Sequence, residues 1–367
     1  MKKIVFLCEH HFHYLQGGAE YQVLLLAKNL ILQGFEVHHI FIDYGYDNIP
    51  TKDESGYLHP LRHWNSNNWY TQYTFSKKLI INIINSIKPD WIYHRNLSYF
   101  LNVATEYSLR SQCKTIWHIS ADKEIRPIKV KFNRKLFRSY FMRKYFIKKG
   151  IRNADYIVAQ TKFQKKGLQQ NFNIDCSLIL PNFHPEPKGR EKITDKMRII
   201  WVANIKEWKQ PEIYIELAKK FYNTENVVFQ IAGRLEKNQF GNKINDLLSE
   251  AKNIEYLGEL SIDEVNQYID QASIFINTSK PDEGFPNSFI QAWMRNVPVI
   301  SLNFDPDDVI KTYHLGLHSG SIKQMIQDVK TLINDVKLRN EMGERAKNYA
   351  MKYHSESNIT DLVSLIH

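Results

Sequence analysis

The chain has 367 residues and a net charge of +10, and 43% of its residues are hydrophobic. That length predicts two domains, each large enough to bury a sizeable core. The three cysteines, Cys8, Cys113 and Cys176, are far apart in the sequence, which argues against disulfides or a structural zinc site and favours a reducing compartment.

The net positive charge is confined to the N-terminal half. Residues 1–182 contain 26 Lys and Arg against 13 Asp and Glu, a net charge of +13, whereas residues 183–367 have a net charge of −3. The N-terminal half is therefore expected to face an anionic partner, which leaves membrane lipid, nucleic acid or a phosphorylated acceptor open. No apolar run approaches the ~20 residues needed to span a membrane.

Strands alternate with helices along the N-terminal half. The sequence predicts a buried strand at 3–8, a His-rich loop ending at Gly17 and Gly18, and a helix at 19–33. Further strands are expected at 35–43, 91–93, 115–117, 156–159 and 178–180, and helices at 77–87 and 99–110, whereas residues 44–75 are hard to assign. Such alternation predicts parallel strands joined by right-handed crossovers.

The same alternation restarts after a short linker. Residues 183–196 carry prolines and a glycine among charged residues and are the predicted linker. Residues 1–182 and 197–367 are therefore expected to form two doubly wound, Rossmann-like α/β domains, with the last helix a candidate to pack back on the N-terminal domain. Ligands bind such sheets at the carboxyl ends of the strands, so a ligand is expected in an interdomain cleft.

The segment 282–293 follows a predicted strand and opens a helix. Gly284 permits close approach of the backbone to a ligand, and Pro286 suits a first helical turn. The N–H groups of Asn287 and Ser288 would then face a guest at the positive end of the helix dipole, and phosphate is the natural candidate. Glu283 stands beside this position in the loop.

Motifs in a fixed order resemble the retaining glycosyltransferases of family 4. They are Gly17-Gly18-Ala19-Glu20, Trp201-Val202-Ala203-Asn204 with Lys209, Ile231-Ala232-Gly233-Arg234, Leu257-Gly258-Glu259-Leu260 and Glu283-Gly284-Phe285-Pro286-Asn287. The last of these is the most specific. The resemblance covers nearly the whole chain. It implies the two-domain GT-B fold, sugar transfer from a nucleotide donor with retention of configuration, and no cofactor or catalytic metal.

The resemblance assigns donor binding to the C-terminal domain. Lys209 would stabilise the diphosphate leaving group, where negative charge develops in the transition state. Glu283 would contact hydroxyls of the donor sugar. Leu257 would lie under the nucleotide base, and Arg234 would reach the base or a phosphate. The donor is expected to be UDP- or GDP-linked.

The N-terminal domain is expected to bind the acceptor. His118, at the end of a predicted strand, would touch the donor sugar near the reacting centre. Arg95 is similarly placed and would bind an anionic acceptor or a phosphate. Gly17 and Gly18 open a helix, so their N–H groups would cradle the pyrophosphate or approach the acceptor.

Two positions depart from the family pattern. Asn204 stands where the family usually has Arg, which removes one cation from the diphosphate site. Gln291 stands where the second Glu of the E-x7-E pattern is expected, and its amide can hydrogen-bond a ribose but brings no charge. These departures leave open a degraded paralogue that binds without catalysis. The same fold also serves nucleotide-sugar epimerases and phosphorylases, and both of these functions stay open.

Residues 126–152 contain eleven Lys and Arg and no acidic residue. Lys131, Arg134, Lys135 and Arg138 fall on one face of a predicted helix, beside an apolar stripe. This pattern predicts docking on anionic lipid or, alternatively, a solvated helix packed on its sheet. Nucleic acid is not expected, because no binding module is present.

We therefore expect a cytoplasmic enzyme, peripheral to the inner membrane face, that glycosylates a lipid-linked or glycan acceptor. Surface polysaccharide, lipopolysaccharide and glycolipid synthesis are the expected pathways. No metal is expected. His10, His11 and His13 invite a metal, but their loop offers no carboxylate beyond Glu9 and lacks zinc-ligand spacing.

Overall fold

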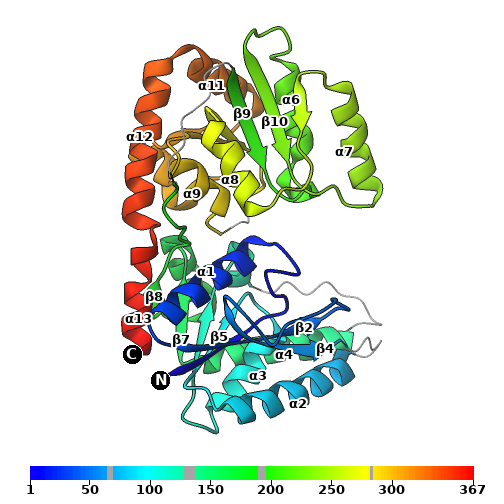
Figure 1. Cartoon of the computed structure of the whole chain (residues 1–367), viewed down its shortest axis with the longest axis vertical. Coiled ribbons are helices and arrows are strands. Elements are labelled where there is room, and N and C mark those ends of the chain that lie inside the picture. Colours follow the sequence, from blue (N-terminus) through cyan, green and yellow to red (C-terminus); the bar gives the residue numbers. More distant parts are fainter. Residues whose placement is uncertain (64–68, 128–136, 189–195, 282–283) are drawn as a thin grey trace. The chain divides into compact units, whose positions relative to one another are not determined.

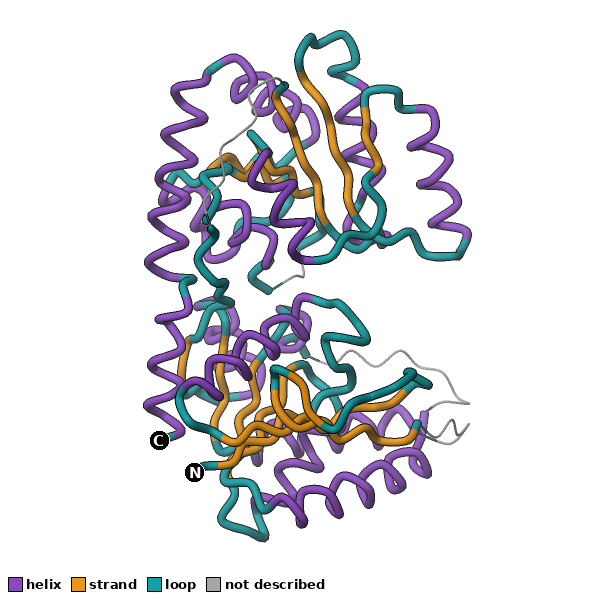
Figure 2. The backbone as a smooth tube through the Cα atoms, viewed as in Figure 1, coloured by secondary structure: helices purple, strands orange, loops and turns teal. Residues whose placement is uncertain are grey.

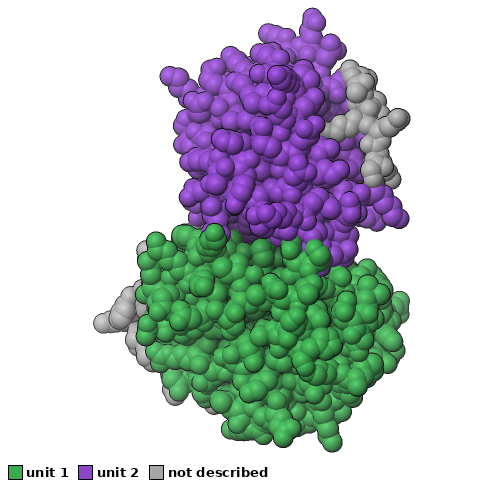
Figure 3. All heavy atoms as spheres, turned by 90° about the vertical axis from the view of Figure 1, so that its left-hand side faces the viewer, with its two compact units in different colours: residues 1–182, 357–367 green, residues 183–356 purple. Residues whose placement is uncertain are grey.

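The computed structural model describes residues 1–63, 69–127, 137–188, 196–281 and 284–367. They form two compact units, residues 1–182 with 357–367 and residues 183–356 (Figure 3). Three of the sequence-based expectations fall wholly or partly outside the described residues. They concern Glu283, much of the linker 183–196, and residues 128–136 of the basic segment 126–152.

The first unit is built on an eight-stranded sheet in the order β3-β4-β2-β1-β5-β6-β7-β8. The strands are β1 (Lys3–Leu7), β2 (Glu36–Asp43), β3 (Lys52–Asp53), β4 (Gly56–Arg62), β5 (Trp91–Arg95), β6 (Lys114–His118), β7 (Tyr156–Ala159) and β8 (Leu178–Ile179). Neighbouring strands run parallel except for the antiparallel β3 and β4. Apart from the edge strands β3 and β8, this is the Rossmann order, and its switch point lies between β1 and β5.

Helices cover both faces of this sheet. They are α1 (Gly18–Leu32), α2 (Trp69–Ile87), α3 (Tyr99–Ser108), η1 (Asp122–Ile125), α4 (Phe137–Asn153), α5 (Lys162–Phe172) and α13 (Thr360–Ile366). Figure 1 shows α2, α3 and α4 on the side of the sheet opposite α1. Val5 and Leu7 of β1 pack in the cluster of Ile80 and Phe100. The alternate residue Phe6 is equally buried, because successive strand side chains point to opposite faces.

The C-terminal end of the chain belongs to the first unit. Lys2 Nζ donates a hydrogen bond of 3.0 Å to the carbonyl of Ile366. The rings of Phe35 and His367 lie 5.0 Å apart. These contacts hold α13 beside the start of the first strand.

The second unit is built on a six-stranded parallel sheet in the order β11-β10-β9-β12-β13-β14. Its strands are β9 (Met197–Val202), β10 (Val227–Ala232), β11 (Ile254–Tyr256), β12 (Ile274–Asn277), β13 (Val299–Ser301) and β14 (Gly316–His318). This is again the Rossmann order, with the switch point between β9 and β12.

Helices also pack on both faces of the second sheet (Figure 2). They are α6 (Pro211–Lys219), α7 (Gln239–Glu250), α8 (Ile262–Gln271), α9 (Asn287–Trp293), α10 (Val309–Tyr313), α11 (Ile322–Asn334) and α12 (Val336–Tyr353), with the short turns η2 (Glu207–Lys209), η3 (Pro306–Asp308) and η4 (Glu356–Ile359). Ile199 and Trp201 pack in a cluster with α6, α7 and α11. Ile200, between them, packs with α8, α9 and α10. Alternate residues of one strand thus supply both cores.

Polar side chains set where several helices begin. Ser98, Thr161, Asn238 and Ser321 each accept a hydrogen bond from a backbone N–H in the first turn of the helix that follows. Ser261 forms a reciprocal capping box with the third residue of α8. Caps of this kind satisfy N–H groups that have no partner inside the helix.

The predicted pair of doubly wound α/β domains is confirmed, and the differences lie at element boundaries. The stretch 44–75, hard to assign from sequence, contains β3, β4 and the start of α2. Pro286 is the N-cap of α9, one position before the predicted first turn. Within the described residues, no helix has the length and apolar character to cross a bilayer.

Candidate functional site

A polar turn lies at the switch point of the second sheet. The turn η2 follows β9, and Thr278 follows β12. Thr278 Oγ1 accepts a hydrogen bond of 2.9 Å from Trp201 Nε1 and donates one of 2.8 Å to the carbonyl of Lys209. The turn ends at Gln210, which adopts a left-handed φ of 51°. The backbone of Lys209 is thereby fixed at the edge where ligands bind doubly wound sheets.

The surroundings of the Lys209 side chain lower its pKa. Its Nζ lies 4.2 Å from the ring centroid of Trp208. Lys209 is half-buried, and this partial burial, and then the charge of Lys206, lower the pKa of Lys209 to about 7. A bound anion would stabilise the ammonium form, so the site is suited to a phosphate whose negative charge increases during reaction.

The fold brings Asn204, Arg234 and Leu257 to the same edge of the second sheet. They follow the neighbouring strands β9, β10 and β11. The loops after β9 and β10 lie in close contact, because a Cβ on Gly233 would stand 1.8 Å from the carbonyl oxygen of Ala203. Only glycine permits this approach, which explains the glycine before Arg234.

Arg234 can exchange its present partner for a ligand at a low cost in free energy. Its Nη1 lies 3.6 Å from Glu259 Oε1, and both side chains are about half exposed. Such a solvent-exposed ion pair contributes at most about 1 kcal/mol. A phosphate or a base could therefore replace Glu259 as the partner of Arg234.

The other predicted nucleotide-binding residues lie on α9. Asn287 and Ser288 begin the helix, and none of the described side chains caps it. The Asn287 side chain is hydrogen-bonded to His184. Gln291 is buried, and its Nε2 donates a hydrogen bond of 2.9 Å to Asn266 Oδ1 on α8. The predicted contact of Gln291 with a ribose stays a prediction, and a ribose would have to compete with Asn266 for this amide.

In the first unit, Arg95 and His118 are paired across adjacent strands. They are opposite each other in the register of β5 and β6. Arg95 Nη1 lies 3.3 Å from His118 Nδ1, and the Tyr93 hydroxyl also hydrogen-bonds this nitrogen. A guanidinium can only donate, so Nδ1 is the acceptor and the ring proton is on Nε2. Arg95 Nη2 donates to Asn182 Oδ1 at 2.6 Å.

This arrangement makes His118 a neutral donor. Burial, and then the charge of Arg95, lower the pKa of His118 well below its usual value, against a smaller opposing contribution from the Leu180 backbone. The Leu180 backbone approaches the His118 ring. Even so, no well-aligned hydrogen bond from the described residues satisfies the buried His118 Nε2. A buried N–H of this kind is costly, so its satisfaction by a ligand hydroxyl would be favourable.

Sequence reasoning did not single out Glu124 as a site residue. Glu124 lies on η1 and is hydrogen-bonded by Ser120. Burial raises its pKa to about 7, although Ser120 and the charge of Arg95 act in the opposite direction. No local pattern marks this residue, because η1 reads as ordinary loop and the burial arises only in the folded unit.

A second acidic residue near Arg95 is Glu20, which lies at the start of α1. Its Oε2 is only 2.2 Å from the position that a Cβ on Gly17 would take. Burial raises the pKa of Glu20, against a backbone hydrogen bond and the charges of His10 and Arg95. The expectation that Gly17 and Gly18 cradle a phosphate stays a prediction. A phosphate at this helix start would have to displace the Glu20 carboxyl.

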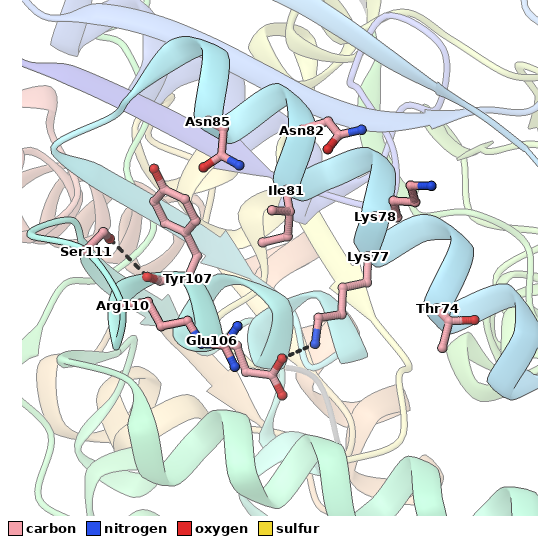
Figure 4. Close-up of a pocket in the computed structure, with 10 residues that line it drawn as sticks. All are labelled: Thr74, Lys77, Lys78, Ile81, Asn82, Asn85, Glu106, Tyr107, Arg110 and Ser111. Atoms are coloured by element: carbon pink, nitrogen blue, oxygen red, sulfur yellow. Dashed lines mark hydrogen bonds and ion pairs between the residues drawn. The ribbon is translucent and has the colours of Figure 1, made fainter.

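A cavity of about 550 Å³ in the first unit contains none of the predicted site residues. It lies between α2 and α3 and has Lys77, Lys78, Glu106 and Arg110 among its lining residues (Figure 4). Glu106 forms ion pairs with Lys77 and with Lys149 of α4. One carboxylate thus faces several cations, and the cavity is basic.

Two family models match the chain in succession. Residues 16–183 match the model described as Glycosyltransferase Family 4, and residues 183–349 match Glycosyl transferases group 1. An uncharacterized glycosyltransferase of Methanocaldococcus jannaschii is 25% identical over 263 residues. That alignment covers 66% of this chain and 64% of the relative, so the chain spans just under two thirds of the length of this relative.

Solved structures confirm the predicted GT-B fold. Sucrose-phosphate synthase from Thermosynechococcus elongatus has a TM-score of 0.80 at 12% identity, covering 100% of this chain and 98% of its own. S. aureus TarM has a TM-score of 0.77 at 13% identity, covering 100% of both chains. Anabaena HepE, solved with UDP-glucose, has a TM-score of 0.76 at 14% identity, covering 100% of this chain and 99% of its own.

Proposed function

The chain belongs to glycosyltransferase family 4, and we propose that it transfers a sugar from a nucleoside-diphosphate donor with retention of the anomeric configuration. HepE binds UDP-glucose and TarM was solved with UDP, which supports a uridine nucleotide as the first donor to test. The second unit binds the nucleotide sugar, and the first unit binds the acceptor.

The observation that carries this proposal is the fixed turn of Lys209 at the switch point of the second sheet. The hydrogen bond from Thr278 Oγ1 to the Lys209 carbonyl holds the turn. An amine whose backbone is held there before the substrate arrives can take the ammonium form beside a diphosphate and stabilise its departure. The contribution of Lys209 is the more important because Asn204 stands where the family usually has an arginine, so one cation is missing from the diphosphate site.

The proposed reaction needs no protein nucleophile. The acceptor hydroxyl attacks the anomeric carbon on the face of the leaving group, and its proton passes to an oxygen of the departing diphosphate. The bond from the anomeric carbon to the diphosphate oxygen breaks, and Lys209 stabilises the resulting charge. Glu283 orients the donor sugar by accepting hydrogen bonds from the sugar hydroxyls. The Nε2–H of His118 donates to another sugar hydroxyl.

The proposed acceptor is a lipid-linked or polysaccharide glycan at an anionic membrane surface. The net charge of +13 in residues 1–182 supports this choice. The basic cavity between α2 and α3 also supports an anionic acceptor. Lys149, on α4 within the segment 126–152, pairs with Glu106 in the lining of this cavity, so the cavity and the basic segment are connected. Synthesis of surface polysaccharide or glycolipid is the class of pathway that uses such acceptors.

The first experiment is a thermal-shift screen of UDP, GDP and their sugar conjugates on the whole chain. A bound donor raises the melting temperature by mass action. The donor that binds is then incubated with a glycan acceptor, and the anomeric configuration of the product is read by NMR. Absence of binding by every nucleotide would contradict the proposal, and isomerisation of donor alone would favour an epimerase.

Glu283→Gln tests the assignment of the donor-sugar contact. The variant keeps the shape of the side chain and removes its charge, so we expect lower kcat with nearly unchanged affinity for the free nucleoside diphosphate. Glu225→Gln, an exposed site in the same unit, is the matched control. Unchanged turnover in Glu283→Gln would remove this residue from the site.

A further inference from the structure

Two histidines and an aspartate meet at one edge of the first unit. His11 and His13 come from the loop between β1 and α1, and Asp53 comes from β3. Asp53 Oδ2 lies 3.1 Å from His13 Nδ1 and 3.8 Å from His11 Nε2. One ligand atom from each residue lies within 4.8 Å of the other two. The sequence analysis did not expect a metal, because the loop offers no carboxylate beyond Glu9 and lacks zinc-ligand spacing. The fold supplies a further carboxylate, Asp53, from another segment.

Asp53 Oδ2 faces both histidines and has no well-aligned hydrogen bond from the described residues. The oxygen is buried, and no hydrogen bond from the described residues reaches it, despite the nearby histidine nitrogens. The other oxygen, Oδ1, accepts hydrogen bonds from Ser55 N at 2.7 Å and Ser55 Oγ at 2.6 Å. The carboxylate is therefore oriented by one oxygen while the other faces the two imidazoles.

An outer layer supports the histidines as well. His13 presents its second nitrogen, Nε2, to Glu54 Oε1 at 3.2 Å, and Glu54 is held by Lys28 at 3.3 Å. Metal-binding histidines commonly present their other nitrogen to a carboxylate in this way. His11 Nε2 is hydrogen-bonded to Ser55 Oγ at 3.2 Å. Because that hydroxyl already donates to Asp53 Oδ1, a metal ion at His11 Nε2 would replace the Nε2 proton and this hydrogen bond.

We propose that His11, His13 and Asp53 form a binding site for a divalent transition metal ion, with Zn²⁺ as the best fit. Tetrahedral zinc with bonds of about 2.0–2.1 Å spaces its ligand atoms roughly 3.3 Å apart. The observed 3.1 Å and 3.8 Å bracket that spacing. Two imidazoles and one carboxylate suit zinc, whereas Ca²⁺ and Mg²⁺ prefer oxygen ligands. Since His13 is 35% exposed, water completes the coordination.

The ion would join two segments that are distant in the sequence. It would clamp the loop that ends at Gly17 onto the turn between β3 and β4. Both ends of that loop are set by the sheet and by α1, so the clamp fixes the middle of a segment next to the switch point of the first sheet. The site is therefore structural, and its occupancy stabilises the first unit.

The test uses the whole chain without a polyhistidine tag, stripped with a chelator and titrated with Zn²⁺. We expect one equivalent to bind in competition with a chromophoric chelator and to raise the melting temperature. Co²⁺ in place of Zn²⁺ should give the visible absorption of a four-coordinate ion. Wild-type protein that binds no stoichiometric Zn²⁺ would overturn the proposal.

Variants decide whether the bound ion lies in this cluster. His13 is partly exposed, so the variant His13→Asn should still fold in the presence of chelator. It should no longer bind one equivalent of Zn²⁺ and should not give the Co²⁺ spectrum. Ser55→Ala, which removes the hydroxyl that orients Asp53, should weaken binding by about 10–100-fold. His314→Asn is the control, because Asn suits the left-handed backbone there. Equal binding by His13→Asn and wild type would place the ion elsewhere and refute the site.

Discussion

Thr278 holds Lys209 through its backbone, because Thr278 Oγ1 donates a hydrogen bond of 2.8 Å to the Lys209 carbonyl. The same hydroxyl accepts from Trp201 Nε1. One side chain after β12 thus fixes the turn after β9, across the switch point of the second sheet. The backbone of Lys209 is positioned by a residue that sequence analysis had not named.

Thr278→Val should therefore weaken nucleotide binding without removing a charge. The substitution leaves the buried Trp201 Nε1 without its acceptor and frees the Lys209 turn. We expect a loss of about 1–3 kcal/mol in the free energy of unfolding and weaker binding of a nucleoside diphosphate, measured by urea denaturation and calorimetry. Thr278→Ser keeps the hydroxyl and should resemble wild type. Equal losses in both variants would contradict the hydrogen-bond explanation.

The charge state of Lys209 should make nucleotide affinity depend on pH. Its pKa of about 7 in the free protein means that binding a diphosphate above that pH requires uptake of a proton. Affinity should then fall by up to about tenfold per pH unit above about pH 7, until the pKa of the complex is reached. Calorimetric titrations from slightly acidic to alkaline pH measure this slope.

Substitutions at Lys209 separate charge from protonation. Lys209→Arg keeps the cation at every accessible pH, so its affinity should be nearly independent of pH. Lys209→Met should weaken binding by roughly 10–100-fold, the cost of losing one hydrogen bond to a charged group. Lys220→Met, an exposed site in the same unit, should change neither. A Lys209→Arg variant with the wild-type pH slope would show that another group titrates.

Glu124 should give the first unit a measurable pH dependence of stability. Its pKa of about 7 lies above the usual 4.5, so the native state binds more protons than the unfolded state between these values. The stabilising contribution is complete below about pH 4.5 and is lost as the pH rises through about 7, a change of roughly 3 kcal/mol. Denaturation midpoints across this range measure it.

Glu124→Gln should flatten that profile relative to wild type. The amide stays neutral at every pH and can still hydrogen-bond Ser120. Asp47→Asn, at an exposed position of the same unit, should leave the profile parallel to that of wild type. Parallel profiles for Glu124→Gln and wild type would show that Glu124 titrates normally.

The basic segment 126–152 should direct the chain to anionic lipid. Each basic residue near such a surface contributes about 1 kcal/mol, so replacing Lys131, Arg134 and Lys135 by Ala should weaken binding to phosphatidylserine-containing vesicles by roughly a hundredfold. Co-sedimentation with vesicles measures the change, and binding should fall with added salt.

A matched variant separates the position of the charge from the net charge. Replacing the exposed Lys243, Lys252 and Lys337 by Ala removes the same three charges from the second unit. This variant should keep most of its vesicle binding. If both triple variants lose binding equally, the attraction comes from overall charge and the segment 126–152 has no special role.

The sequence by itself determined the family, the two doubly wound domains and the order of the motifs, because these follow from local patterns. Strand and helix periodicities and glycines at loop ends are properties of neighbouring residues. The positions of Arg95 and His118 at strand ends could also be read locally, and the structure confirms that they lie there.

Only the tertiary structure decided how residues from distant segments combine. Asp53 meets His11 and His13 because β3 folds back along β4, and Thr278 meets Lys209 because β12 lies beside β9. The pKa of about 7 for Lys209 likewise depends on burial. Strand order and desolvation arise from long-range packing, so no local pattern in the sequence could have revealed these contacts.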